Sequence, residues 1–158
     1  MNTSIVLCLA FAIGVIAGLR TFTAPAVVCW AAYLGWINLH GSHLAFLGSI
    51  ITAVIVTLLA IFELVNDKLP KTPNRTTPGP LGARIVMGAL SGAALAITGA
   101  QAVWLGAVLA IVGAVVGAFG GYQVRHQIVT RLKVKDIFVA LTEDLIAIGG
   151  GLLIVTRF

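Results

Sequence analysis

Two adjacent carboxylates, Glu143 and Asp144, lie inside a segment that is otherwise apolar. Insertion of a charged side chain at the centre of a membrane helix is unfavourable by at least about 2.5 to 3.5 kcal/mol. Such a pair must therefore be paired with opposite charge, hydrated or protonated, or must take part in the function of the protein. On a helix, the two acids border a seam of small residues formed by Ala140, Ala147 and Gly151. The pattern is typical of an ion, proton or substrate site, and the alternative is a structural ion pair or hydrogen-bonded lock between helices.

Two arginines are the natural counter-charges for this acidic pair. Arg20 interrupts 38 otherwise apolar residues, beside Thr21 and Thr23, whereas Arg84 begins a later apolar run. Arg20 is the better functional candidate, either as counter-charge to the acids or as a contact for an anion. For Arg84, extension of the side chain to the lipid headgroups is a sufficient explanation.

The remaining polar candidates lie near the ends of apolar runs. Glu63 is one residue from such an end, and Asp67 follows one turn later. Because an acid at a helix end loses little hydration, pairing with neighbouring basic residues is favoured over a direct role. Arg75 could contact phosphate, but a solvated loop is the favoured interpretation of its proline-rich surroundings. The candidate binding residues are Glu143, Asp144, Arg20, Arg84, Glu63, Asp67, Thr21 and Arg75.

Catalytic and metal-binding signatures do not occur in the sequence. It has no nucleophile elbow, HExxH, P-loop or CxxC motif, and His40 and His43 have no third ligand nearby. We therefore expect no enzymatic activity, no cofactor and no metal site. The net charge of +5 would suggest nucleic acid in a soluble protein, but these basic residues lie between apolar runs, where they contact lipid headgroups. No nucleic-acid partner is expected.

Composition indicates a membrane protein. The 158 residues are 59% hydrophobic and 9% charged, against about 25% charged residues in soluble domains. Only helices satisfy the backbone of such runs in lipid. The sequence therefore predicts one all-α membrane domain, residues 1–158, which forms a polytopic bundle of five to six transmembrane segments. The apolar runs cover residues 5–19, 24–38, 44–64, 84–98, 102–122 and 136–156.

The count of segments depends on the first 38 residues. Pro25 and the polar residues before it interrupt the apolar run. One interpretation is two short spans joined on the cytoplasmic side, and the other is one broken or re-entrant element with Arg20 at depth. Gly18-Leu-Arg20 and Gly82-Ala-Arg84 also suggest a weak internal repeat.

Small residues recur at helical spacing in three of these runs. One face carries Gly106, Ala110, Gly113, Gly117 and Gly121, and two shorter pairs are Gly14 with Gly18 and Gly88 with Gly92. Such faces allow close approach of helix backbones, either within the chain or between copies in a homo-oligomer.

Basic residues mark one side of the membrane. The connectors at residues 65–83 and 123–135 carry most of the Lys and Arg, whereas the opposite connectors carry none. The positive-inside rule predicts that both basic connectors are cytoplasmic.

Four motifs carry a resemblance to a known family: Gly-Leu-Arg-Thr-Phe-Thr-Ala-Pro at 18–25, Glu-Leu-Val-Asn-Asp-Lys-Leu-Pro-Lys-Thr-Pro-Asn-Arg-Thr at 63–76, Gly-Ala-Arg at 82–84 and Glu-Asp-Leu-Ile-Ala-Ile-Gly at 143–149. In combination they resemble the bacterial membrane family called domain of unknown function 4126. The resemblance covers nearly the whole chain and implies no activity. It implies an integral protein of the bacterial inner (plasma) membrane. It implies that eight residues fall on motif positions, compatible with a shared polar centre: Arg20, Glu63, Asp67, Pro70, Arg75, Arg84, Glu143 and Asp144.

Two functions fit these residues. The first is a small transporter or channel for an ion, proton or small solute, in which the acidic pair binds and the arginines supply counter-charge. The alternative is a non-enzymatic lipid-binding or partner-binding membrane protein in which the same residues lock helices together. Convergence of Arg20, Arg84, Glu63, Glu143 and Asp144 on one water-accessible cavity would favour the first function, and their dispersion into separate interfacial pairs would favour the second.

Overall fold

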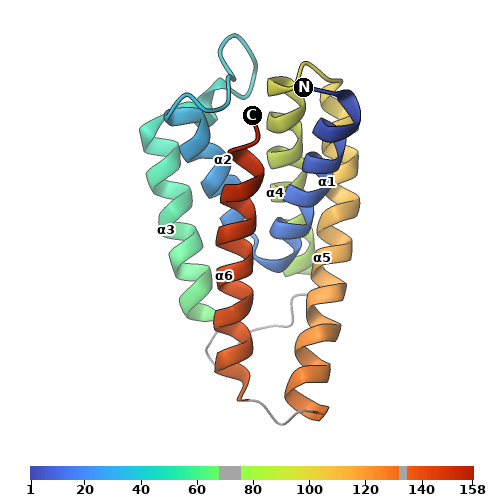
Figure 1. Ribbon diagram of the computed structural model, residues 1–158. Coiled ribbons are helices and arrows are strands. Elements are labelled where there is room, and N and C mark those ends of the chain that lie inside the picture. The colour runs from blue at the N-terminus through green and yellow to red at the C-terminus, as the bar shows by residue number, and fades with distance from the viewer. Residues whose placement is uncertain (68–75, 132–134) are drawn as a thin grey trace.

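The computed structural model describes residues 1–67, 76–131 and 135–158, and these ranges contain six α-helices. The helices run alternately in opposite directions along one elongated bundle, so the two ends of the chain lie at the same end of it (Figure 1). The described ranges contain no strand. In chain order the elements are α1 (Thr3–Leu19), α2 (Thr23–Tyr33), the short 3-10 helix η1 (Ala45–Gly48), α3 (Ile50–Asn66), α4 (Pro78–Thr98), α5 (Val103–Arg131) and α6 (Asp136–Val155).

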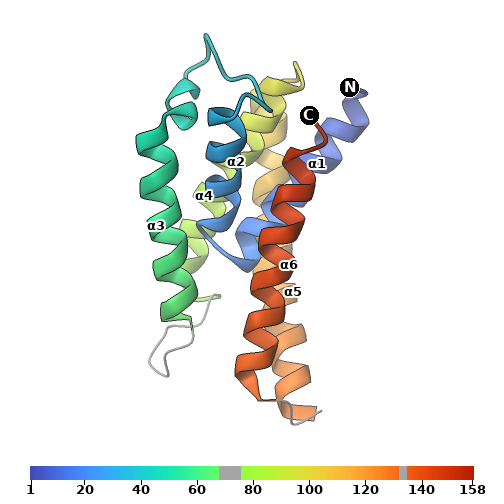
Figure 2. The ribbon, with the colours of Figure 1, turned by 60° about the vertical axis from the view of Figure 1, so that its left-hand side comes forward.

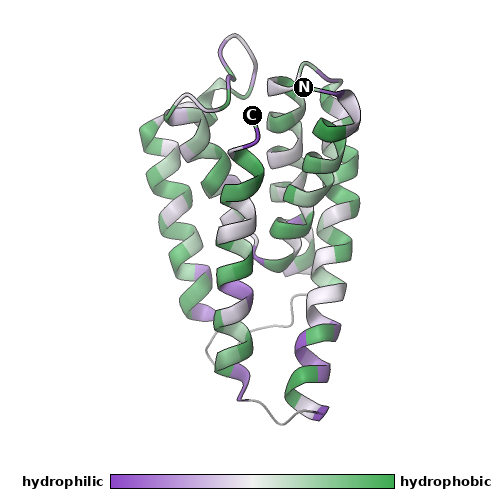
Figure 3. Ribbon diagram, viewed as in Figure 1, coloured by the Kyte–Doolittle hydropathy of each residue, from purple (hydrophilic) through white to green (hydrophobic). Residues whose placement is uncertain are grey.

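Three of the helices in the described ranges are long and apolar enough to cross a membrane. These are α4, α5 and α6, with 21, 29 and 20 residues, whereas α1, α2 and α3 are shorter apolar helices of 17, 11 and 17 residues. Figure 3 shows hydrophobic residues along most of the bundle, with hydrophilic residues gathered towards the end that is opposite the two termini. The predicted all-helical membrane architecture is confirmed at this level.

One side of the bundle is built on direct backbone contact between α1, α4 and α5. Gly14 on α1 lies against the backbone of Ala110 on α5, and Gly92 on α4 lies against Gly106. A Cβ atom at any of these glycines would overlap the neighbouring helix, which is why the sequence places small residues there. The small-residue faces therefore serve packing within the chain.

The other helices close the bundle around an apolar core. Helix α2 packs against α3 and α6, and it also contacts α4. Figure 2 shows α2 between α3 and α6. The core contains fully buried side chains from several helices, among them Ile13 of α1, Val28 of α2 and Leu95 of α4.

Helices α1 and α2 form a short antiparallel hairpin. Helix α1 ends at Leu19 and α2 begins at Thr23, so the chain reverses through residues 20–22. Pro25 lies in the first turn of α2, where the missing N–H has no helical partner to lose. The reversal places Arg20 in the interior with no exposed surface.

Several helix bounds differ from the bounds of the predicted apolar runs. Helix α2 ends five residues before residue 38, because the chain turns near Gly35, which has a φ of +78°. Helix α4 begins at Pro78, not at residue 84, because prolines are tolerated in a first helical turn. Helix α5 continues through Arg131, so most of the predicted connector at 123–135 is helical. Helix α3 begins at Ile50, six residues after the predicted start at 44.

Candidate functional site

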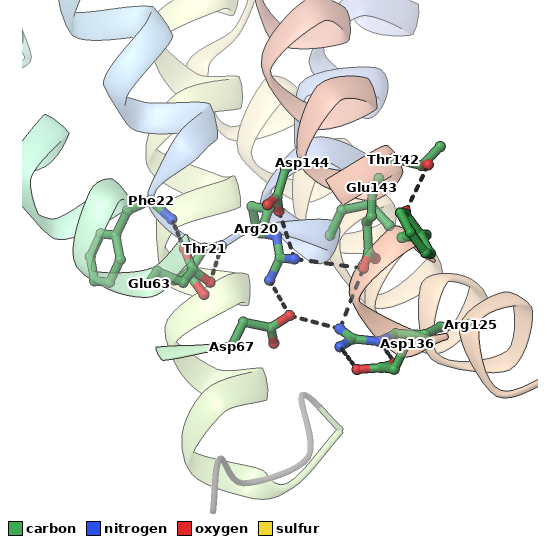
Figure 4. Close-up of polar contacts among 12 residues, drawn as sticks. Arg20, Thr21, Phe22, Glu63, Asp67, Arg125, Asp136, Thr142, Glu143 and Asp144 are labelled. Atoms are coloured by element: carbon green, nitrogen blue, oxygen red, sulfur yellow. Dashed lines mark hydrogen bonds and ion pairs between the residues drawn. The ribbon is translucent and has the colours of Figure 1, made fainter. Parts of the chain in front are cut away.

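Arg20 is the centre of a buried ionic cluster (Figure 4). Its Nη1 atom lies 2.7 Å from Oδ2 of Asp67, and its Nη2 atom lies 2.7 Å from Oδ1 of Asp144. Nη2 also lies 3.9 Å from Oε2 of Glu143. Because Asp67 ends α3 and the acidic pair belongs to α6, this one guanidinium joins the hairpin turn to two other helices.

A second arginine, Arg125 on α5, extends the cluster. It donates two hydrogen bonds to the carboxylate of Asp136, at 2.8 and 2.7 Å, and one to Oδ2 of Asp67, at 2.7 Å. Its Nη1 atom lies 3.8 Å from Oε2 of Glu143. Asp67 therefore bridges the two guanidinium groups through one oxygen. Paired hydrogen bonds of this kind fix orientation as well as charge.

Glu63 and Arg84 hold the break between α1 and α2. The carboxylate of Glu63 accepts hydrogen bonds from the backbone N–H groups of Thr21, at 2.7 Å, and Phe22, at 2.9 Å. Arg84 donates from Nη1 to the backbone carbonyl oxygens of Gly18, at 2.7 Å, and Leu19, at 2.9 Å.

Each partner has the charge that its helix end favours. A carboxylate meets the positive amino end of α2, and a guanidinium meets the negative carboxyl end of α1. Nη2 of Arg84 also lies 3.5 Å from Oε1 of Glu63, which ties the two caps together.

Exposure falls steadily along the chain of ion pairs. The side chain of Asp136 is 55% exposed, that of Arg125 is 17% exposed, and that of Asp67 is 15% exposed, whereas Arg20 is fully buried. All five acidic residues of the protein belong to this cluster, together with three of its arginines. A connected row of charges thus leads from the surface to the interior.

The electrostatics of Asp67 follow from its two arginine neighbours. Burial by itself would raise the pKa of this carboxyl group. The charge of Arg20 and the hydrogen bonds from Arg125 and Arg20 outweigh burial, so the pKa of Asp67 lies below its ordinary value. Asp67 is therefore held as a carboxylate.

Sequence reasoning identified most of the cluster. The structure brings together Glu143, Asp144, Arg20, Arg84, Glu63 and Asp67 in one network. Thr21 contributes through its backbone N–H group. Arg75 lies outside the described residues, as do Pro70 and the loop lysines Lys68 and Lys71.

The interpretation of Arg84 as a headgroup contact was wrong, since its side chain is buried against the carboxyl end of α1. Arg125 and Asp136 were missed as site residues. A signal for Arg125 was present, because Gly113, Gly117 and Gly121 lead to it at a spacing of four residues, which is one helix face. The described residues include no group of three or more His, Cys, Asp or Glu that could hold a metal ion.

Apolar helices long enough to cross a membrane, folded around a buried cluster of arginines and acids, define a helical membrane protein with an ionic centre. The chain belongs to the family described as domain of unknown function DUF4126, whose model matches residues 7–157. The resemblance noted in the sequence is thereby confirmed over essentially the whole chain. No curated protein and no solved structure matches it.

Proposed function

We propose that the protein is a small membrane transporter or channel that moves a proton or small cation through its ionic cluster. The observation that carries the proposal is the convergence of four of the five acids, Glu63, Asp67, Glu143 and Asp144, on the break between α1 and α2. Arginine stays charged at any physiological pH, so the carboxylates are the groups that can take up a proton or bind a cation.

The row of charges supplies access from one side. Asp136 is the exposed end of the row, and Arg125 and Asp67 connect it to the buried Arg20. Glu143, like Asp67, lies within 4 Å of both guanidinium groups, so a proton or cation that binds to either acid changes the field at both arginines. Interrupted helices with charged ends at an interior site are the arrangement that many transporters use.

An apolar core fills the opposite half of the bundle. Ile13, Val28 and Leu95 are fully buried there, beyond the hairpin turn. In the proposed mechanism this conformation is the state open to one side. Movement of the α1–α2 hairpin relative to α6 would expose the cluster to the other side, because Arg20 and its partner Asp144 lie on these two elements.

The proposal includes an orientation and an assembly. Arg131 and Lys135 lie exposed near the end of the bundle that carries the cluster, and the positive-inside rule places this end in the cytoplasm of a bacterial cell. With α1, α2 and α3 each counted as a short span, we propose six membrane segments, or five where α1 and α2 are counted as one broken element. Short spans are accommodated by local thinning of the bilayer or by oligomerisation, and we include a homo-oligomer on this ground.

Flux measurements in proteoliposomes test the proposal. The purified protein is reconstituted with a pH-sensitive dye inside the vesicles, a potassium diffusion potential is imposed, and sodium uptake is followed in parallel. We expect the wild type to move one of these cations faster than empty vesicles. Glu143→Gln combined with Asp144→Asn removes both charges with little change in volume, and should reduce the flux at least tenfold. Arg157→Gln, at the far end of the bundle, should leave it unchanged.

The same experiment decides against the alternative function. The 2.7 Å pairing of Arg20 with Asp67 and Asp144 favours a purely structural lock, because close pairs hold helices together. A lock predicts no flux above that of empty vesicles for protons, sodium or potassium in the wild type, and a lower melting temperature for the double variant. That result overturns transport, as does a double variant that moves the cation at the wild-type rate.

A further inference from the structure

A groove with a volume of about 390 Å³ lies between α5 and α6, beside the ionic cluster but outside its hydrogen bonds. Its walls are mainly apolar and include Val124 and Ile128 from α5 and Phe138, Val139 and Ile146 from α6. Arg125 and Glu143 lie along its wall, on the side towards the cluster. Volumes of this size are typical of pockets that hold small molecules.

The groove is open to the surroundings of the bundle. Val124, Phe138 and Ile146 are each more than half exposed, although they line it. In a membrane, such a surface faces lipid acyl chains and not water. From Phe138 to Ile146 the groove follows two turns of α6, which is about 12 Å of helix. This shape accommodates an extended hydrocarbon chain that lies along the two helices.

One end of the groove carries positive charge. Arg131 follows Ile128 by one helical turn, and Lys135 precedes Phe138 by a similar distance; both residues are exposed. The one exposed acid nearby, Asp136, is already bound through both oxygens to Arg125. An apolar channel with cations at its mouth is complementary to an amphiphile with a negative headgroup.

We propose that this groove binds one acyl chain of an anionic phospholipid, whose phosphate is held by Arg131 and Lys135. The inference is independent of transport, because it uses the lipid-facing side of α5 and α6 and two cations that make no contribution to the cluster. The bound lipid covers Glu143 and Arg125 on their membrane side, so that water reaches the cluster only from the end at Asp136.

Retention of lipid by the purified protein tests the site. Detergent-solubilised protein is equilibrated with equal amounts of phosphatidylglycerol and phosphatidylcholine, and bound lipid is counted by native mass spectrometry. Each cation near a membrane surface contributes about 1 kcal/mol, or about fivefold in affinity, so two cations predict a preference of about 25-fold for phosphatidylglycerol. Arg131→Gln with Lys135→Gln should abolish the preference, while Arg157→Gln should preserve it.

A second pair of variants tests the apolar part. Val124→Trp fills the groove and should reduce retention of both lipids at least tenfold. Val116→Trp is the matched control, because Val116 lies on the same helix with similar exposure but does not line the groove.

Three results would overturn the proposal. The first is equal retention of the two lipids by the wild type, and the second is an unchanged preference after loss of both cations. The third is a dimer that Val124→Trp dissociates and Val116→Trp does not, which assigns the groove to a second copy of the chain.

Discussion

Gly117 is a position at which a single added methyl group should be strongly destabilising. Its partner across the interface with α1 is backbone: a Cβ atom there would overlap the carbonyl oxygen of Val15 and lie 3.0 Å from the carbonyl carbon and Cα of the same residue. No rotamer change relieves this contact, so Gly117→Ala must push α1 away from α5. Gly18, which supplies a carbonyl oxygen to Arg84, lies against Gly117 and must move as well.

The expected magnitude follows from two opposing effects. Overpacking costs about 1 to 3 kcal/mol, and the upper value applies because the opposing atoms are backbone. Replacement of glycine by alanine inside a helix by itself stabilises that helix by about 1 kcal/mol. The net loss is about 2 kcal/mol, which lowers the melting temperature of a protein of this size by about 4 to 8 °C.

Thermal unfolding in detergent, followed by intrinsic tryptophan fluorescence, measures this loss. Gly120→Ala is the matched control, since Gly120 lies on the same helix and a Cβ atom there has no neighbour within 4 Å. The control should melt at or slightly above the wild-type temperature. Equal melting temperatures for the two alanine variants would refute the backbone contact between α1 and α5.

Further predictions concern the ionic cluster, and melting temperature checks each of them. Glu63→Gln should destabilise the protein by about 2 to 3 kcal/mol, because a neutral amide weakens two charge-assisted hydrogen bonds, whereas Asp136→Asn at the exposed end should cost at most about 1 kcal/mol. Arg20→Gln should cost about 3 to 5 kcal/mol by leaving buried carboxylates without their counter-charge, and adding Asp144→Asn should recover part of the loss; a purely additive double variant would contradict the pairing. The pKa of Asp67 is lower in the folded protein than in the unfolded chain, so the ionised carboxylate stabilises the fold fully above about pH 4. This stabilisation is lost as the pH falls through the pKa of the folded state. Asp67→Asn should therefore make the melting temperature depend less on pH in the acid range.

The sequence was informative wherever one residue type contradicts its surroundings. Arg20, Glu143 and Asp144 interrupt apolar runs, and the cost of a charge in lipid marks them without knowledge of the fold. The glycine faces were also readable, because a repeat of small residues at helical spacing has a direct packing meaning. Whether they pack within or between chains required the structure, which places α1 against α5.

The sequence was misleading where charge and hydropathy change gradually. Arg84 and Arg125 lie near the ends of apolar runs, where a solvated or headgroup-facing side chain is the simpler interpretation. Burial of Arg84 depends on the carbonyl oxygens at the end of α1, which become available only because the hairpin reverses there. Arg125 was assigned to a connector because hydropathy falls after residue 122, although the helix continues for two more turns. The partners of these two arginines are distant in the sequence, so the residues around each arginine give little indication of them.

The position of Arg20 in the chain has a consequence for biosynthesis. A polypeptide is made from its amino end, so the α1–α2 hairpin exists before any of the acids that neutralise Arg20. The first of these, Asp67, follows α3, and the others belong to α6, which comes after the other five helices along the chain. Since an unpaired guanidinium resists burial in lipid, the hairpin gains its full stability at depth only after α6 has been made. The ionic centre is therefore assembled late in synthesis, although its central arginine is made early.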